Sequence, residues 1–122
     1  MFTTYPQIHL ELNVHWNKTP HTNKWYKFSD LNLEHCQFHN LLGVYVIRSG
    51  PYTVKLGYGN LRTKLKQDRR DLKIMAFPNL EITWAEVKQD YHKGIERFLD
   101  EYCRPFIGTR FHDDEPIIVN FP

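Results

Sequence analysis

A cluster of basic residues between Asn60 and Met75 is the feature of the sequence with the clearest chemical meaning. This stretch holds six cations and two acids, a difference of +4, whereas the whole chain carries a net charge of only +2. The cations are Arg62, Lys64, Lys66, Arg69, Arg70 and Lys73. Cations grouped along one helix are typical of a surface that faces phosphates. A merely solvated helix face is the alternative interpretation, because charged side chains are mostly exposed in any protein.

The residues before this cluster predict a β-hairpin that ends at two glycines. Gly43–Arg48 and Tyr52–Tyr58 are rich in Val, Ile, Leu and Tyr, and Ser49-Gly50-Pro51 separates them, which is typical of two strands joined by a turn. Gly57 and Gly59 lack a Cβ, so they would let the strand turn sharply and let a phosphate approach the backbone closely. Alternation along both strands assigns four apolar residues to the core, namely Val44, Val46, Val54 and Leu56. Tyr45 and Lys55 then emerge together beside the basic cluster.

The remaining pattern predicts an α+β fold. Asn60 is a good N-cap for a helix that runs to about Leu72, and one stripe of this helix would carry Leu61, Leu65, Asp68 and Leu72. Residues 80–87 alternate and predict a third strand. A second helix is expected from an Asp90 cap to a point before Pro105, because the residue before proline avoids the helical region. The order β-β-α-β-α implies a small three-stranded antiparallel sheet with flanking helices.

The two ends of the chain lie outside this arrangement. The alternating residues from Ile8 to Trp16 predict an extra strand, and residues 28–42 suggest a short helix capped by Ser29 or Asp30. The C-terminal "PIIVNFP" predicts a tail strand or an extended segment. We therefore divide one domain, residues 1–122, into an N-terminal extension (1–41), a core (42–107) and a tail (108–122).

The composition indicates the class of protein, and the cysteines indicate its compartment. The chain has 122 residues, is 41% hydrophobic and 25% charged, and contains 18 aromatic residues (8 Phe, 3 Trp and 7 Tyr), as expected of a globular domain. No apolar run reaches the roughly 20 residues of a membrane span. The cysteines Cys36 and Cys103 form no CxxC motif, which favours a cytoplasmic protein with free thiols.

The order and spacing of these motifs resemble the GIY-YIG nuclease domain family. "GVY" at residues 43–45 is similar to the first motif of the family, and "KLG" at residues 55–57 is similar to the second. "GIERFLDEYCRP" is similar to the family's last helix, because Glu96 stands nine residues before Pro105. The resemblance covers about residues 42–107. It implies a metal-dependent endonuclease that hydrolyses phosphodiester bonds of DNA.

The resemblance implies a role for each matching residue. Tyr45 would be the general base or would position the water, and Glu96 would hold Mg²⁺ or Mn²⁺, since Mg²⁺ commonly takes one or two carboxylates. Lys64, with Arg62 in reserve, would stabilise the charge on the phosphate. Lys55 belongs to the same site. Gly43, Gly57 and Gly59 would be structural, and the six cations of the basic cluster would bind nucleic acid along its backbone.

Three positions depart from the family pattern. Lys55 replaces the second tyrosine, for which Tyr58 is a possible substitute. Lys64 stands where the family has arginine, and lysine lacks the bidentate fork of arginine. Gly108 stands where the family often has asparagine, for which Asn120 is a possible substitute.

These departures leave other functions open. A catalytically degenerate relative would bind nucleic acid or a protein partner without cleavage. A small metal-binding or interaction protein built around His35, Cys36 and His39 is a further alternative, although structural zinc requires four ligands. With no second domain to direct it, a nuclease of this size would depend on a homodimer or on a targeting partner protein.

Overall fold

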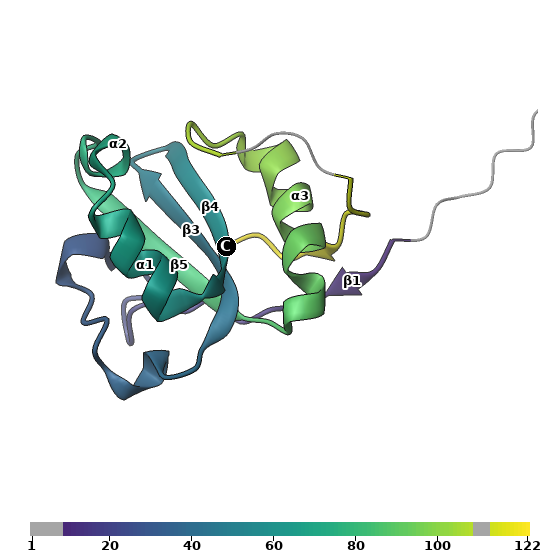
Figure 1. Cartoon of the computed structure of the whole chain (residues 1–122), viewed down its shortest axis with the longest axis horizontal. Helices are drawn as coiled ribbons and strands as arrows, with labels where there is room; N and C mark the ends of the chain where they lie inside the picture. The colour runs from purple at the N-terminus through teal and green to yellow at the C-terminus, as the bar shows by residue number, and fades with distance from the viewer. Residues whose placement is uncertain (1–8, 109–112) are drawn as a thin grey trace, which may run out of the picture.

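The structure is a computed structural model that describes residues 9–108 and 113–122, and it combines two sheets with helices (Figure 1). The larger sheet has four antiparallel strands in the order β2-β5-β3-β4. These strands are β2 (Tyr26–Lys27), β3 (Leu42–Ser49), β4 (Tyr52–Asn60) and β5 (Leu80–Glu86). The helices are α1 (Leu61–Arg69), α2 (Leu72–Met75) and α3 (His92–Cys103). The predicted α+β class is therefore confirmed.

The sheet has one strand more than predicted, because β2 pairs with the outer edge of β5. Tyr26 lies opposite Ile82, and Lys27 lies opposite Glu81. The period-2 pattern of a strand needs about four residues to be visible. A strand of two residues shows no such pattern, which is why the sequence did not indicate it.

The predicted hairpin of β3 and β4 is confirmed, with a bulge that the sequence did not reveal. The register shifts between Ile47 and Arg48, which makes Val54 the extra residue of β4. A bulge changes the side toward which neighbouring residues point. Val54 accordingly packs with Tyr45, whereas Leu56 lies in the opposite core. The prediction that Val54 and Leu56 share a face is wrong.

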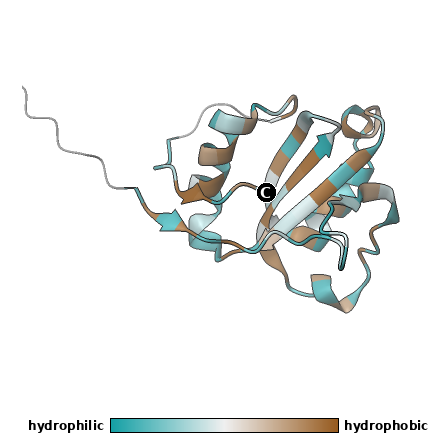
Figure 2. Cartoon of the chain, turned by 180° about the vertical axis from the view of Figure 1, so that it is seen from behind, coloured by the Kyte–Doolittle hydropathy of each residue, from teal (hydrophilic) through white to brown (hydrophobic). Residues whose placement is uncertain are grey.

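The four-stranded sheet has a buried apolar cluster on each face. One cluster lies under α1 and includes Leu61 and Leu65, and the other lies under α3 and includes Ile95 and Leu99. Figure 2 shows apolar residues along the strands. Because β3 is central and covered on both sides, Tyr45 is only 1% exposed. Tyr45 and Lys55 lie together beside α1 as predicted, since both contact Asp68, but Tyr45 is buried there.

Helix α1 begins as predicted and ends early. The side chain of Asn60 accepts a hydrogen bond from the backbone N–H of Thr63 at 3.1 Å, so its role as N-cap is confirmed. The helix ends at Arg69, and Asp71 then caps the separate helix α2. This break turns Leu72 outward, and its side chain is 84% exposed. The predicted place of Leu72 on the buried stripe is wrong.

Helix α3 begins later than predicted and ends as predicted. A 3₁₀ turn, η3 (Gln89–Tyr91), precedes it, so Asp90 lies within this turn and is not the N-cap. The helix ends at Cys103, and Arg104 follows in the left-handed conformation with φ of 47°. The predicted end before Pro105 is confirmed.

The two ends of the described chain form a second, parallel sheet. It consists of β1 (Glu11–Leu12) and β6 (Ile118–Val119). The predicted strands at both ends are confirmed for these residues, and Ile8 lies outside the described part of the chain. The side chain of Asn120 joins the ends, because it accepts from Val14 N at 2.7 Å and donates to Val14 O at 2.9 Å.

The segment between β2 and β3 contains only short 3₁₀ turns. These are η1 (Phe28–Asp30) and η2 (Cys36–Phe38). No side chain caps η1, so the predicted helix with a Ser29 or Asp30 cap is wrong. Within the described ranges, no helix combines the length and the apolar character needed to cross a bilayer.

Candidate functional site

A buried cluster of Tyr45, Lys55 and Asp68 lies between the hairpin and α1. The Tyr45 hydroxyl donates a hydrogen bond to Oδ2 of Asp68. Lys55 Nζ lies 2.5 Å from Oδ1 of the same carboxylate. Tyr45 and Asp68 are both buried, and Lys55 reaches the carboxylate from β4 with its side chain 24% exposed. Tyr45 and Lys55, two predicted site residues, therefore both contact Asp68. The sequence pattern had placed Asp68 only on the buried stripe of the first helix and not in the site.

The environment of Tyr45 works against its predicted role as a base. Burial raises the pKa of its hydroxyl far above the ordinary value, and the charge of Asp68, the hydrogen bond to Asp68 and the charge of Glu96 raise this pKa further. A phenol that stays protonated and donates to a carboxylate cannot accept a proton from water at neutral pH. The charge of Glu96 on α3 is the smallest of these causes.

The raised pKa of Tyr45 predicts an unusual alkaline titration. The pKa of Tyr45 is higher in the folded than in the unfolded protein. Ionisation of this residue therefore does not change the free energy of unfolding below about pH 10, and above that pH it lowers the free energy by up to about 1.4 kcal/mol per pH unit. We expect one of the seven tyrosines to ionise only when the protein unfolds. Ultraviolet absorbance of tyrosinate during a pH titration measures this, and Tyr45→Phe should remove that late step. A full tyrosinate signal from the folded protein would contradict the assignment.

Gly57 provides the space that the ring of Tyr45 occupies. A Cβ at Gly57 would lie 2.3 Å from Cζ of Tyr45 and 2.4 Å from its hydroxyl oxygen. The sequence predicted a close phosphate at this position, and the structure places a tyrosine ring there. At Gly43, a Cβ would lie 2.1 Å from the carbonyl oxygen of Ala85 on β5. Gly59 has φ of 124°, which glycine adopts readily.

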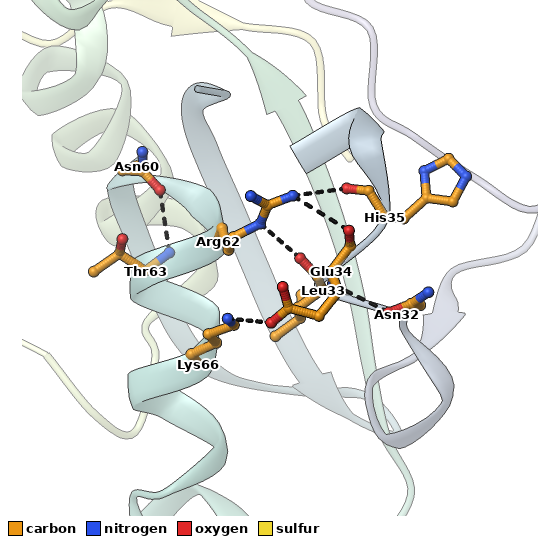
Figure 3. Close-up of polar contacts among 8 residues, drawn as sticks. All are labelled: Asn32, Leu33, Glu34, His35, Asn60, Arg62, Thr63 and Lys66. Atoms are coloured by element: carbon orange, nitrogen blue, oxygen red, sulfur yellow. Dashed lines mark hydrogen bonds and ion pairs between the residues drawn. The ribbon is translucent and has the colours of Figure 1, made fainter. Parts of the chain in front are cut away.

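Arg62 and Lys66 on α1 bind the segment before β3 through hydrogen bonds and an ion pair (Figure 3). Arg62 Nε donates to the carbonyl of Leu33 at 2.8 Å, and its Nη2 donates to the carbonyls of His35 at 3.0 Å and Glu34 at 3.5 Å. Lys66 forms an ion pair with the Glu34 carboxylate, and this hydrogen bond and charge lower the pKa of Glu34. Both cations are directed toward the protein itself.

Arg69 has a similar internal role. Its Nη2 donates to the carbonyls of Phe28, at 2.6 Å, and Leu31. Burial lowers the pKa of the guanidinium. Of the six cations predicted to bind nucleic acid, those that remain exposed are Lys64, Arg70 and Lys73.

Lys64 lines a cavity of about 610 Å³ between the first turns of α1 and α3. Its Cε lies 3.3 Å from the position of a Cβ at Gly59. Tyr58 lines the same cavity, and its ring centroid lies 5.7 Å from that of the buried His92. Lys93 faces the cavity from α3. The charge of the lining is mixed, because it also includes Asp90, Asp114 and Glu115.

The predicted metal centre depends on Glu96 and not on a cluster of ligands. Residues 9–108 and 113–122 contain no group of three or more His, Cys, Asp and Glu side chains that could hold a metal ion. Asp68, the carboxylate beside Tyr45, already has a partner on each oxygen. Glu96, the predicted ligand of Mg²⁺ or Mn²⁺, is half-buried on α3 and contributes a single carboxylate. Mg²⁺ commonly binds through one or two carboxylates and completes its shell with water and phosphate oxygens, so Glu96 stays the predicted ligand.

Two further predicted residues, Asn120 and His35, form hydrogen bonds that hold parts of the protein together. Asn120 is held by the backbone of Val14, and its carbonyl accepts a hydrogen bond from Trp16 Nε1 at 2.8 Å. Its side chain therefore binds the N-terminal segment instead of a substrate. His35 caps η2 by accepting from Gln37 N at 3.1 Å. His39 follows this three-residue turn, so the two histidines do not share a face of an α-helix.

Asp68 is the central residue that the sequence motifs did not assign to the site. The signal in the sequence was its position on a stripe that otherwise contains leucines. A carboxylate on an apolar stripe points into the protein, where burial is costly unless the charge is paired. That reasoning predicts a cationic partner for Asp68, and Lys55 is that partner.

No protein-family model, curated protein or solved structure gave a match to this chain. The likeness to GIY-YIG nucleases therefore stays at the level of motifs and element order.

Proposed function

We propose that this chain is a nucleic-acid-binding module with a GIY-YIG-like order of elements, and that it binds phosphodiester backbones without hydrolysing them. The observation that carries the proposal is the buried carboxylate of Asp68. It accepts a hydrogen bond from Tyr45 and an ion pair from Lys55. The Tyr45 hydroxyl and the Lys55 ammonium, which would act on a phosphodiester, are therefore both bound to Asp68 inside the protein.

The exposed cations support binding. Lys64, Arg70 and Lys73 lie on α1, at its end and on α2, where they can reach phosphates that pass along this side of the molecule. Contacts of this kind release counterions and carry no sequence readout. The cysteines Cys36 and Cys103 are free thiols, which supports a reducing compartment such as the cytoplasm.

A second candidate is the metal-dependent endonuclease that the motifs predict. The observation that favours it is that the charge of Glu96 is among the causes that raise the pKa of Tyr45. The buried state of Tyr45 argues against it.

The proposed function predicts salt-dependent DNA binding through Lys64 and Lys73. We expect the double variant Lys64→Gln/Lys73→Gln to lower the slope of log affinity against log salt by about 1.8, because each lost phosphate contact with duplex DNA removes about 0.9. Fluorescence anisotropy of a labelled duplex across a salt series measures this slope. The matched control is Lys24→Gln/Lys88→Gln, which removes the same charge at two other exposed lysines.

Two results would overturn the binding proposal. The first is a wild-type protein that leaves the anisotropy of the duplex unchanged even at low salt. The second is an equal loss of slope in both double variants, because this would show a general effect of net charge instead of a surface on α1 and α2.

A further inference from the structure

A second cavity, of about 1090 Å³, is lined by Gly50 and Pro51 at the turn of the hairpin and by Met75 on α2. Aromatic and other apolar residues dominate its walls. Tyr52 and Phe106 are 59% and 60% exposed. Their ring centroids lie 5.8 Å apart, and the ring of Phe77 continues the row 5.6 Å from Phe106. An exposed apolar surface of this kind is typical of a site that binds a protein, a membrane or a ligand.

A projecting side chain stands next to this hollow. Leu72 is 84% exposed, and it precedes Met75, which lines the cavity, by three residues on α2. Residues three apart are neighbours on one side of a helix. The surface thus carries a cavity and, beside it, an exposed apolar side chain that could enter the same cavity of another molecule.

The charges at the cavity are balanced. Lys27 and Asp30 both line it and are both exposed. Glu81 also lines it and is paired with Arg48 at 3.1 Å. One exposed cation and one exposed anion do not attract a polyanion such as DNA. In two copies related by a two-fold axis, however, Lys27 of each copy can face Asp30 of the other, because a two-fold interface pairs one patch with itself.

We infer that this surface binds a second copy of this chain. Leu72 of each copy enters the cavity of the other, and the Lys27 and Asp30 pairs flank the contact. Tyr52, Leu72, Met75 and Phe106 are 39–84% exposed, and a fully exposed aromatic residue presents about 150–250 Å², so their full burial would remove roughly 500 Å² per copy. The total of about 1,000 Å² is the minimum for a biological interface and lies below the roughly 1,200 Å² of stable ones, so the dimer forms reversibly. This inference does not depend on nucleic-acid binding.

Sedimentation velocity across a concentration series tests the dimer with a matched pair of variants. We expect the mass of the wild type to rise with concentration from 14.7 kDa toward twice that value. Phe106→Asp should weaken the dimer by about tenfold or more. Phe121→Asp is the control, since Phe121 is also 60% exposed and also packs on two aromatic rings, and it should leave the dimer unchanged. Circular dichroism establishes that both variants are folded.

A charge reversal tests the orientation of the two copies. Lys27→Glu should weaken the dimer, and adding Asp30→Lys to the same chain should restore it, because each copy then again presents opposite charges. Three outcomes would overturn the inference: a wild type that stays monomeric at every concentration, an equal effect of Phe106→Asp and Phe121→Asp, or no rescue by the second reversal. A fourth outcome would also overturn it: if Phe106→Asp lowers the DNA affinity of the monomer and Phe121→Asp does not, the surface binds nucleic acid instead.

Discussion

Replacing Asp68 by alanine is expected to lower the free energy of unfolding by about 2–4 kcal/mol. The substitution leaves the buried Tyr45 hydroxyl without its acceptor, which costs about 1–3 kcal/mol. It also removes the partner of Lys55, and breaking a buried ion pair by removing one partner is strongly destabilising. Lys55 keeps a side chain that is 24% exposed, so water offsets part of this second loss. Urea denaturation followed by circular dichroism measures the difference.

The control for this prediction is Asp90→Ala. Asp90 is exposed and does not cap α3, so its replacement should change stability by less than about 0.5 kcal/mol. A double-mutant cycle of Asp68→Ala with Tyr45→Phe isolates the hydrogen bond between these residues, and we expect a coupling of about 1 kcal/mol or more. Equal effects of Asp68→Ala and Asp90→Ala would mean that the cluster is not a buried paired site.

Gly57→Ala is expected to destabilise the fold by about 3 kcal/mol, the upper part of the usual range for an overpacked core. The added methyl group would lie 2.3 Å from Cζ of Tyr45, and the ring is buried between the sheet and α1, so it has little space into which it can move. Thermal and urea denaturation of the purified variant measure the loss.

The comparison for Gly57→Ala is Gly50→Ala. Gly50 has φ of 57°, and a Cβ added to it would have no neighbouring atom within 4 Å, so its replacement introduces backbone strain of about 1 kcal/mol without a clash. In a Tyr45→Leu background, which lacks the outer ring atoms, the cost of Gly57→Ala should fall. A cost that is unchanged by Tyr45→Leu would show that Gly57 is required for another reason.

Local signals in the sequence predicted the elements that need only near neighbours. The turn at Ser49-Gly50-Pro51 predicted the hairpin, and Asn60 predicted the start of α1. Pro105 predicted the end of α3. Each of these features depends on residues a few positions apart, whose conformational preferences are strong. The bulge at Val54 depends on how β3 and β4 pair, so one strand alone carries no sign of it.

Contacts between distant segments could not be predicted in the same way. Tyr45 and Lys55 reach Asp68 across 23 and 13 residues, and Asn120 reaches Val14 across 106. A periodic pattern tells which face of a strand or helix is buried, but it does not identify the partner. The count of cations on α1 likewise did not reveal that Arg62 and Arg69 are directed to backbone carbonyls of the preceding segment.

Incubation of the wild-type protein with supercoiled plasmid and Mg²⁺ or Mn²⁺ tests the central claim most directly. The protein is in excess, at the salt concentration at which anisotropy shows binding. Because Asp68 holds both Tyr45 and Lys55, we predict that the plasmid is bound and stays supercoiled. Conversion to nicked circles by the wild type, lost in both Glu96→Ala and Tyr45→Phe, would contradict the account and establish the endonuclease.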